Sequence, residues 1–377
     1  MLSLKQKILL RVKNIPGWRT NRKIVVFSVD DYGNIRIASK EARLRLISRG
    51  LNLSANRFDH YDALEDSNDL DALFGALSSV KDLNGNHAVF TAFAVPATID
   101  FDRMASEGYE RFQYVLLNDV LERTLGYDGT WKHWQEGIKN RFIIPQFHGR
   151  EHVNLKFLNH FLQQKNKMVL ACLEERCWAG LDFSPFPNLD YVSSFSFEQH
   201  SEMESLNSIA IDGLAKFENV FGYSARNFNS PGASAYSDLE KVLAANGIRY
   251  IDTPPLKREH KGNGKYIKRY GYVGQSNSFN QTYLIRNCVF EPSLTNGVDS
   301  VERALYEVAV AFQFSKPAVI SSHRVNFCGH IDEKNRAMGI TALHSLLHKI
   351  VERWPDVEFM TANELGDLIA SENKSNS

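Results

Sequence analysis

The sequence predicts an α/β protein built as a distorted (β/α) barrel of about seven parallel strands with loop insertions. Short runs rich in valine, isoleucine and phenylalanine recur along the whole chain. Their near-continuous apolar character is typical of strands that are buried on both faces. Amphipathic helical patterns separate these runs, and no fixed-period repeat or low-complexity linker divides the chain.

The apolar runs define the expected strands, and residues 225–231 add a further short one. In chain order the expected strands are 23–29, 87–95, 141–147, 191–197, 225–231, 248–253, 283–290, 317–323 and 357–362. The expected helices are 39–50, 69–80, 208–222, 237–247 and 340–354. The glycine-, lysine- and asparagine-rich stretch 255–282 is expected to be a loop insertion.

Composition indicates a globular chain whose core needs no disulfide or metal. The 377 residues are 43% hydrophobic, and 44 basic residues balance 44 acidic ones. This balance argues against nucleic acid as a partner. Residues 23–370 are expected to form one barrel domain, between a basic N-terminal segment (1–22) and a disordered tail (371–377).

Cysteine usage and hydropathy bear on location. The four cysteines form no CxxC pair, which favours free thiols in a reducing compartment. Neither a secretory signal nor an apolar run long enough to span a bilayer is evident, so a cytoplasmic location is expected. Two alternatives stay open for residues 1–22: a basic amphipathic helix on a membrane or another subunit, or a helix packed on the domain. The oligomeric state is not predicted.

Carboxylates and imidazoles cluster where the expected strands end. Asp30 and Asp31 follow the first run, His148 and His152 the third, Asp252 lies in the run at 248–253, and His323 ends the run at 317–323. The carboxyl ends of barrel strands open onto one face, where active sites are built. Glu291, beyond the run at 283–290, is a further candidate for this face.

The spacing of His148 and His152 suggests metal binding. If the segment after Gln146 is helical, residues four apart share a face and both imidazoles reach one point. An aspartate from another strand would complete a site of catalytic type, and the second aspartate would be free as a base. In the structural alternative, His148 makes a hydrogen bond in the core and His152 lies on a solvated helix face. The two aspartates then form a turn or a helix cap.

Four motifs together resemble the polysaccharide deacetylases of the nodulation-factor deacetylase homology type. They are SVDDYG (28–33), HGREH (148–152), FNSPG (228–232) and ISSHR (320–324), in the family's order, and the resemblance runs from about residue 24 to about 368. The aspartate pair followed by an aromatic residue and glycine is also similar to the chitooligosaccharide deacetylases. The fold implied by the resemblance is again a distorted (β/α) barrel.

The resemblance also implies roles. Asp30 would be the general base and His323 the general acid, while Asp31, His148 and His152 would hold one divalent metal ion, usually zinc. Asn229 stands where the family has an arginine, so Arg226, Arg150 or Arg324 is expected to replace that charge, and Asp252 is expected to pair with His323. The residues expected to contact substrate are Tyr32 (through its backbone N–H), Arg150, Asn229, Pro231, Arg324 and Asn326.

The predicted function is that of a metal-dependent hydrolase that removes an acetyl group, most simply N-acetyl, from a sugar or polysaccharide precursor. Two alternatives remain. Asn229 keeps open a non-catalytic carbohydrate-binding or scaffold barrel. A metal-independent glycoside hydrolase would need a pair of carboxylic acids flanking the scissile bond.

Overall fold

A parallel sheet forms the centre of the protein in the computed structural model, which describes residues 3–295 and 297–375. Its strands run in the order β11-β8-β6-β5-β2-β1-β13-β12, and β14 pairs with the start of β1. All the pairings in this sheet are parallel. The nine strands are β1 (Lys23–Tyr32), β2 (Phe90–Ala94), β5 (Ile143–Phe147), β6 (Asn227–Phe228), β8 (Tyr250–Thr253), β11 (Thr282–Ile285), β12 (Cys288–Val289), β13 (Ala318–His323) and β14 (Val357–Phe359).

The two edges of this sheet lie close together. β11 and β12 stand at opposite ends of the strand order, yet only Arg286 and Asn287 separate them in the chain. Three Cα-to-Cα steps span at most about 11 Å. The sheet therefore curls until its edges almost meet, which confirms the predicted distorted barrel and leaves a seam at Arg286–Asn287.

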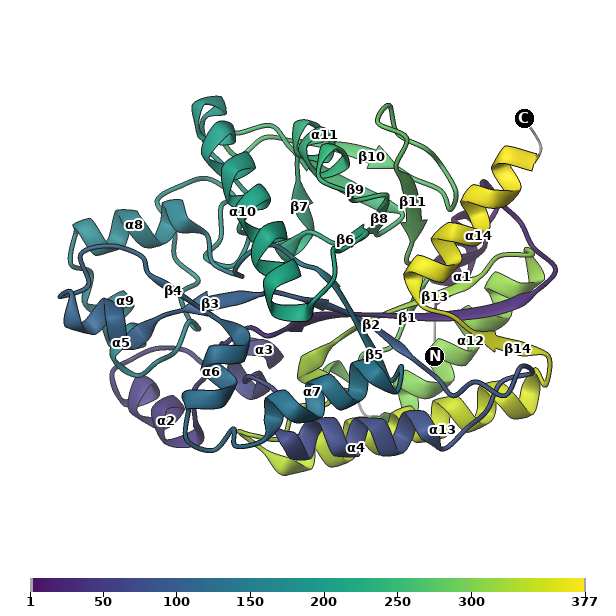
Figure 1. Cartoon of the computed structure of the whole chain (residues 1–377), viewed down its shortest axis with the longest axis horizontal. Helices are drawn as coiled ribbons and strands as arrows, with labels where there is room; N and C mark the ends of the chain where they lie inside the picture. The colour runs from purple at the N-terminus through teal and green to yellow at the C-terminus, as the bar shows by residue number, and fades with distance from the viewer. Residues whose placement is uncertain (1–2, 296, 376–377) are drawn as a thin grey trace.

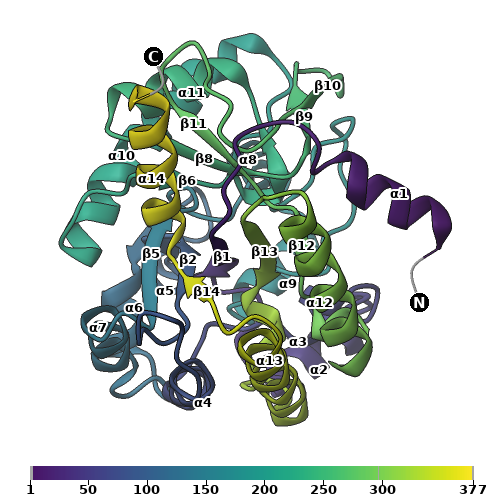
Figure 2. The ribbon, with the colours of Figure 1, turned by 90° about the vertical axis from the view of Figure 1, so that its right-hand side faces the viewer.

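Helices surround the strands. Looking along β1, Figure 2 shows α4, α7, α10, α12 and α13 arranged around the sheet. The helices are α1 (Leu4–Val12), α2 (Lys40–Ser48), α3 (Arg57–Tyr61), α4 (Ser67–Ser78), α5 (Phe101–Ser106), α6 (Leu117–Arg123), α7 (Thr130–Lys139), α8 (Leu155–Gln163), α9 (Lys167–Glu174), α10 (Met203–Phe221), α11 (Ser237–Ala245), α12 (Gly297–Gln313), α13 (Glu333–Arg353) and α14 (Ala362–Ser375). All five predicted helices are present with shifted ends.

Smaller elements lie beyond the carboxyl ends of the strands, on the left and at the top of Figure 1. β3 (Ala97–Ile99) pairs with β4 (Tyr114–Leu116), and β7 (Ser234–Ala235), β9 (Leu256–His260) and β10 (Tyr266–Tyr270) form a second sheet. The short 3-10 turns are η1 (His200–Glu202), η2 (Pro231–Ala233), η3 (Pro292–Leu294) and η4 (Arg324–Asn326). The predicted insertion at 255–282 thus contains an antiparallel hairpin, β9–β10.

The predicted strand at 191–197 is wrong. This segment forms turns, although its aromatic side chains are buried as a strand's would be. Side chains replace the hydrogen bonds of a sheet, because the Asn154 amide donates to the carbonyls of Ser193 and Ser196 and the Trp178 indole donates to that of Tyr191. The backbone is therefore satisfied without a neighbouring strand.

Two further expectations also change. The run at 283–290 is not one strand, because the chain leaves β11 at the seam and re-enters the sheet as β12 at the other edge. The tail predicted to be disordered from residue 371 is helical as far as Ser375, and residues 376–377 lie outside the described residues. The four cysteines are free, as expected, and all four are buried. Within the described chain no helix is both long and apolar enough to cross a membrane.

Candidate active site

A backbone irregularity at the end of β1 brings two neighbouring aspartates to the same site. Side chains alternate along a regular strand, so consecutive residues point to opposite faces. The pairing of β1 with β2 shifts between Val29 and Tyr32, and Asp31 has a φ of +75°. Such a bulge re-aims side chains. Asp30 and Asp31 can therefore both serve the carboxyl end of the sheet.

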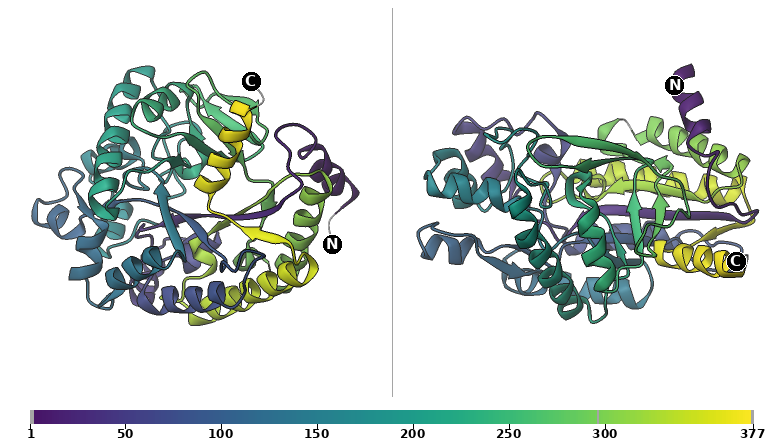
Figure 3. Two further views of the ribbon diagram at one scale, coloured as in Figure 1. Left: turned by 45° about the vertical axis from the view of Figure 1, so that its right-hand side comes forward. Right: turned by 90° about the horizontal axis from the view of Figure 1, so that it is seen from above.

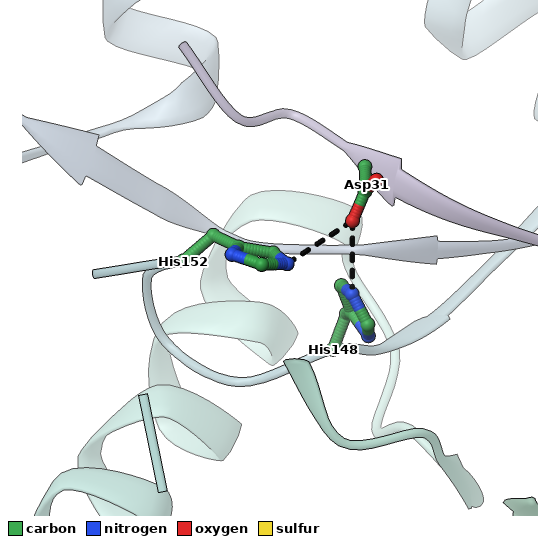
Figure 4. Close-up of side chains that lie close together, drawn as sticks. All are labelled: Asp31, His148 and His152. Atoms are coloured by element: carbon green, nitrogen blue, oxygen red, sulfur yellow. Dashed lines mark hydrogen bonds and ion pairs between the residues drawn. The ribbon is translucent and has the colours of Figure 1, made fainter. Parts of the chain in front are cut away.

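Asp31 meets His148 and His152 in one cluster (Figure 4). Its Oδ1 atom lies 3.4 Å from Nε2 of His148 and 3.1 Å from Nε2 of His152. All three side chains are buried. The ligand atoms of the three residues lie within 4.8 Å of one another. The structure thus brings together the three residues that the sequence suggested as metal ligands.

His148 is oriented by a backbone carbonyl. Its Nδ1 atom lies 3.0 Å from the carbonyl oxygen of Asn229. A carbonyl only accepts hydrogen bonds, so Nδ1 of His148 donates to it, and Nε2 is the ring nitrogen that faces Asp31. Metal-binding histidines are commonly held in this way by a carbonyl behind the ring.

His152 reaches the cluster through a loop. The two histidines were expected to converge if the segment after Gln146 is helical, but α8 begins only at Leu155 and residues 148–154 are irregular. Gly149, with a φ of +87°, turns the chain so that His148 and His152 converge. A Cβ atom at Gly149 would lie 3.1 Å from Cγ of Pro231, so the loop is packed as well as turned. Nδ1 of His152 is buried and has no hydrogen-bond partner among the described residues.

The three donor groups fit a divalent metal. Ligand atoms about 2.0–2.2 Å from a tetrahedral zinc ion lie about 3.4 Å from one another, and the two measured Asp31–histidine separations are 3.1 and 3.4 Å. Two imidazoles and one carboxylate are the donor types found in catalytic zinc sites. Burial opposes ionisation of Asp31, but the two histidines outweigh it and hold its pKa well below the ordinary value. The cluster therefore carries a carboxylate ready to bind a cation.

Asp30 is gripped by an arginine that the sequence did not single out. Arg286 forms a two-pronged ion pair with it, at 2.5 and 2.7 Å. Nε of the same guanidinium bonds to Asp252, which also accepts a hydrogen bond from Ser28 at 2.7 Å. Burial raises the pKa of Asp252 in spite of this ion pair. The charge of Asp30 is thus balanced and its carboxylate fixed in place.

None of the three arginines expected to replace the family's arginine contacts Asp30. Arg226 pairs with Asp367 near the surface, and Arg150 pairs with Glu151 and Asp212. Arg324 is fully buried between Asp62 and Glu65. Asn229 itself donates from its amide to the carbonyl of Asp252. The guanidinium comes instead from the seam of the barrel, at the residue after β11.

His323 lies beside Asp30, on the neighbouring strand. Asp30 and His323 are register partners in β1 and β13, and Nε2 of His323 lies 3.8 Å from Oδ2 of Asp30. Asp252 was expected to pair with this histidine, but Nδ1 of His323 lies 2.6 Å from Glu291, and Asp252 is held by Arg286. Burial opposes protonation of His323, yet the attraction of Glu291 prevails and raises the pKa of His323 to about 9.

A set of polar side chains fixes Glu291 behind His323. Burial disfavours the charged form of Glu291, but His323 and Arg57 more than offset this and lower its pKa to about 2. Arg57 approaches Glu291 to 2.5 Å, and the amide of Asn326 donates to it at 2.6 Å. Asn326 is fully buried, so it supports the ion pair rather than lining an open surface.

The remaining residues expected to contact substrate lie in different places. The Tyr32 ring is buried and packs edge-on against Trp134, which leaves only its backbone for the expected contact. Pro231 is buried against the loop at Gly149. Arg150 is half-buried and stacks on the ring of Tyr114. The buried Arg324 is held by its two carboxylates and is not available to a substrate.

A usable signal for Arg286 was present in the sequence. It is a charged residue directly after a strand, the same pattern that drew attention to Asp30 and His323. The apolar run at 283–290 concealed it, because Arg286 stood inside what was read as one strand. Arg57 has no such signal, since α3 lies far from the strand ends in sequence.

No protein-family model matches the sequence, and no curated protein matches it either. Among solved structures, a protein from Mycobacterium smegmatis assigned as a polysaccharide deacetylase is 12% identical, with 95% of this chain and 94% of that chain covered and a TM-score of 0.46. A protein from Pseudomonas aeruginosa PAO1, likewise assigned, is 9% identical, with 92% and 91% covered and a TM-score of 0.46.

A 4-alpha-glucanotransferase from Thermococcus litoralis scores almost as well. It is 10% identical, with 91% of this chain and 40% of that chain covered and a TM-score of 0.45. With TM-scores below 0.5 and different activities among them, these likenesses add no weight to an assignment of function.

Proposed function

We propose that the protein is a metal-dependent carbohydrate deacetylase. The observation that carries this proposal is the convergence of Asp31, His148 and His152 on one point beside Asp30 and His323. The order of the four motifs supports an acetylated sugar as the substrate, with acetate as one product. The two nitrogen donors and one carboxylate oxygen suit zinc as the metal.

The residues of the chain divide the chemistry between them. A divalent metal in the cluster would polarise the acetyl carbonyl and make an attacking water more acidic. Asp30, oriented by Arg286, would accept the proton that this water loses. His323, kept charged by Glu291, would donate a proton to the departing amine. The N–C(acetyl) bond breaks, and acetate and a free amino sugar leave.

The two alternative functions fit this geometry less well. A glycoside hydrolase working without metal needs one carboxylic acid to give a proton and a second to act as base or nucleophile. Asp30 is ion-paired with Arg286, and Asp31 faces two imidazoles, so neither aspartate is placed to serve as the acid that gives a proton. A scaffold barrel was kept open because Asn229 removes the family's arginine, but Arg286 supplies a guanidinium to Asp30 in its place.

Metal content tests the proposal first. The wild-type chain is compared with His148→Ala/His152→Ala after dialysis against zinc, by plasma mass spectrometry. A matched control is His344→Ala/His348→Ala, which removes an exposed histidine pair of the same spacing from α13. The wild type and the control are expected to retain about one metal ion per chain, and the site variant none. A wild type that takes up no zinc, cobalt or nickel would overturn the metal site.

Acetate release tests the reaction. Metal-loaded wild type is incubated with N-acetylglucosamine oligosaccharides and O-acetylated sugars, and free acetate is measured. Release by the wild type and the control but not by the site variant supports the deacetylase. Metal retention without acetate release from any acetylated sugar would leave the metal site standing and overturn the substrate assignment.

A further inference from the structure

The first turns of the chain expose an unusual amount of apolar surface. Among the described residues, sixteen large apolar side chains are exposed, and five of these fall within twelve residues. Each of the five is more than half exposed; they are Leu4, Ile8, Leu9, Val12 and Ile15, here called the α1 surface. Scattered apolar residues need no explanation, but a cluster of this kind marks a contact surface.

α1 is nevertheless a defined helix with one side attached to the body. Ser3 caps it, with Gln6 completing a capping box. Leu10 is its one buried residue. Asn14, just beyond the helix, is also buried and is bonded to Asn287. The α1 surface therefore has no partner within the described part of the chain.

The exposed apolar residues form a stripe that points away from the body. At 100° per residue, Leu4, Ile8, Val12 and Ile15 fall within 80° of each other on a helical projection continued to residue 15, whereas Leu10 lies on the far side. Figure 2 and the right-hand view of Figure 3 show α1 projecting from the rest of the molecule. The stripe can thus meet a flat surface without obstruction from the body.

Basic residues flank the stripe, and acidic residues are missing from it. Between residues 1 and 29 the sequence has seven basic residues and no aspartate or glutamate, although the whole chain is electrically balanced. Four of the seven belong to α1 and its C-terminal end: Lys5, Lys7, Arg11 and Lys13. No ion pair involves these four within the described residues. Their charge is available to an anionic partner.

We propose that the α1 surface docks the protein on an anionic lipid membrane. A lipid interface accepts the apolar stripe among its acyl chains and the basic flanks among its headgroups. A second copy of the chain fits less well, because pairing two such helices would bring eight cationic side chains together. The proposal is independent of the deacetylase function, since no residue of the α1 surface belongs to the candidate active site.

Vesicle sedimentation with the full chain tests this proposal. Vesicles of phosphatidylcholine alone are compared with vesicles that contain phosphatidylglycerol. Binding to the anionic vesicles is expected to be more than tenfold tighter and to weaken as salt is added. Lys5→Gln/Arg11→Gln should weaken it roughly 25-fold, at about fivefold for each lost charge. Ile8→Asp/Val12→Asp should abolish it.

Control variants separate docking from folding. Leu125 is 93% exposed and Ile211 is 45% exposed, both outside the α1 surface, so Leu125→Asp/Ile211→Asp should bind vesicles like the wild type. Urea unfolding checks that each variant is folded. Three results would overturn the proposal: no wild-type binding to anionic vesicles at low salt, equal binding to neutral vesicles, or binding that Ile8→Asp/Val12→Asp leaves intact. If the wild type binds no vesicles but sediments as a dimer, and Ile8→Asp/Val12→Asp sediments as a monomer, the α1 surface binds a second copy of the chain instead.

Discussion

Arg286 holds together two buried carboxylates that would otherwise repel each other. It joins Asp30 and Asp252 through its two ends, and all three side chains are at least nine-tenths buried. Removing one member of such a cluster leaves an uncompensated buried charge. The resulting loss of stability is larger than the net stability that the intact ion pair provides. Arg286 is therefore expected to matter for the stability of the fold as well as for the orientation of Asp30.

Arg286→Gln is expected to lower the free energy of unfolding by about 3–5 kcal/mol. Arg226→Gln serves as the control, because its pair with Asp367 is partly exposed and should contribute less than about 1 kcal/mol. Urea unfolding followed by circular dichroism measures both. Adding Asp252→Asn to Arg286→Gln should recover part of the loss, since it removes one of the stranded charges. Equal stability of the two single variants would contradict this account.

The pair of His323 and Glu291 makes stability and protonation depend on pH. The pKa of His323 is raised to about 9 in the folded chain, against an ordinary value of about 6.5. Its contribution to stability is therefore complete below pH 6.5 and lost as pH rises through about 9. The pKa of Glu291 is lowered to about 2, so its contribution is present above about 4.5 and lost as pH falls through 2. Solvent screens part of this attraction, because 27% of the His323 side chain is exposed.

Glu291→Gln should lower the pKa of His323 from about 9, because burial then acts without the carboxylate that opposes it most strongly. NMR titration of the His323 ring in metal-free protein measures this directly. The alkaline limb of the pH profile of acetate release should move to lower pH with it. His330 provides an internal reference, since it pairs with Asp66 and not with Glu291 and should titrate unchanged. An unmoved His323 titration would exclude Glu291 as its controlling partner.

At the scale of elements, the loop between β5 and α8 decides whether two histidines form one site. Sequence spacing identified His148 and His152 correctly as neighbours in space but attributed this to a helix. The actual cause is a left-handed turn at Gly149 packed on Pro231. Periodicity could not reveal this, because a positive φ and a contact between distant segments leave no pattern in a short window of sequence.

Gly149→Ala is expected to weaken zinc binding about tenfold, since the added Cβ strains the turn and presses on Pro231. Gly222→Ala is the matched control: Gly222 also has a positive φ, 77°, but a Cβ there meets nothing within 4 Å. Both variants should lose roughly 1–2 kcal/mol of stability from backbone strain alone. Competition titration with a zinc chelator measures affinity. A Gly149→Ala protein with wild-type affinity would show that the turn does not set the site.

The sequence predicted where strands lie along the chain better than it predicted which strands pair with each other. Apolar runs located β1, β5 and β13 because those strands are buried on both faces. The run at 191–197 has the same composition, yet the Asn154 side chain satisfies its backbone and no strand forms. These side-chain hydrogen bonds come from a residue almost 40 positions away in the sequence. Local composition therefore could not tell a strand from a buried loop at this segment.

For the whole molecule, closure of the barrel assembles the site. The seam at Arg286–Asn287 brings a guanidinium from the last strands to Asp30 on the first. The strand-end rule predicted which face would carry the site, and Asp30, Asp31, His148 and His323 do gather there. The same rule applies to Arg286 but does not say which carboxylate it pairs with, because curvature and not sequence order decides which edge strands meet. Arg57 lies on α3, outside the reach of this rule.

Metal binding should therefore stabilise the entire fold. The three ligands come from two segments of the chain, because Asp31 and His148 are 117 residues apart. An unfolded chain does not hold these segments together, so only the folded state gains the binding free energy. At a free zinc concentration 100 times the Kd, unfolding should cost about 2.7 kcal/mol more than in chelator. Urea unfolding with and without zinc measures this difference. His148→Ala/His152→Ala should show none, and His344→Ala/His348→Ala should keep it in full; identical curves for the wild type in zinc and in chelator would mean that the cluster binds no metal in the folded protein.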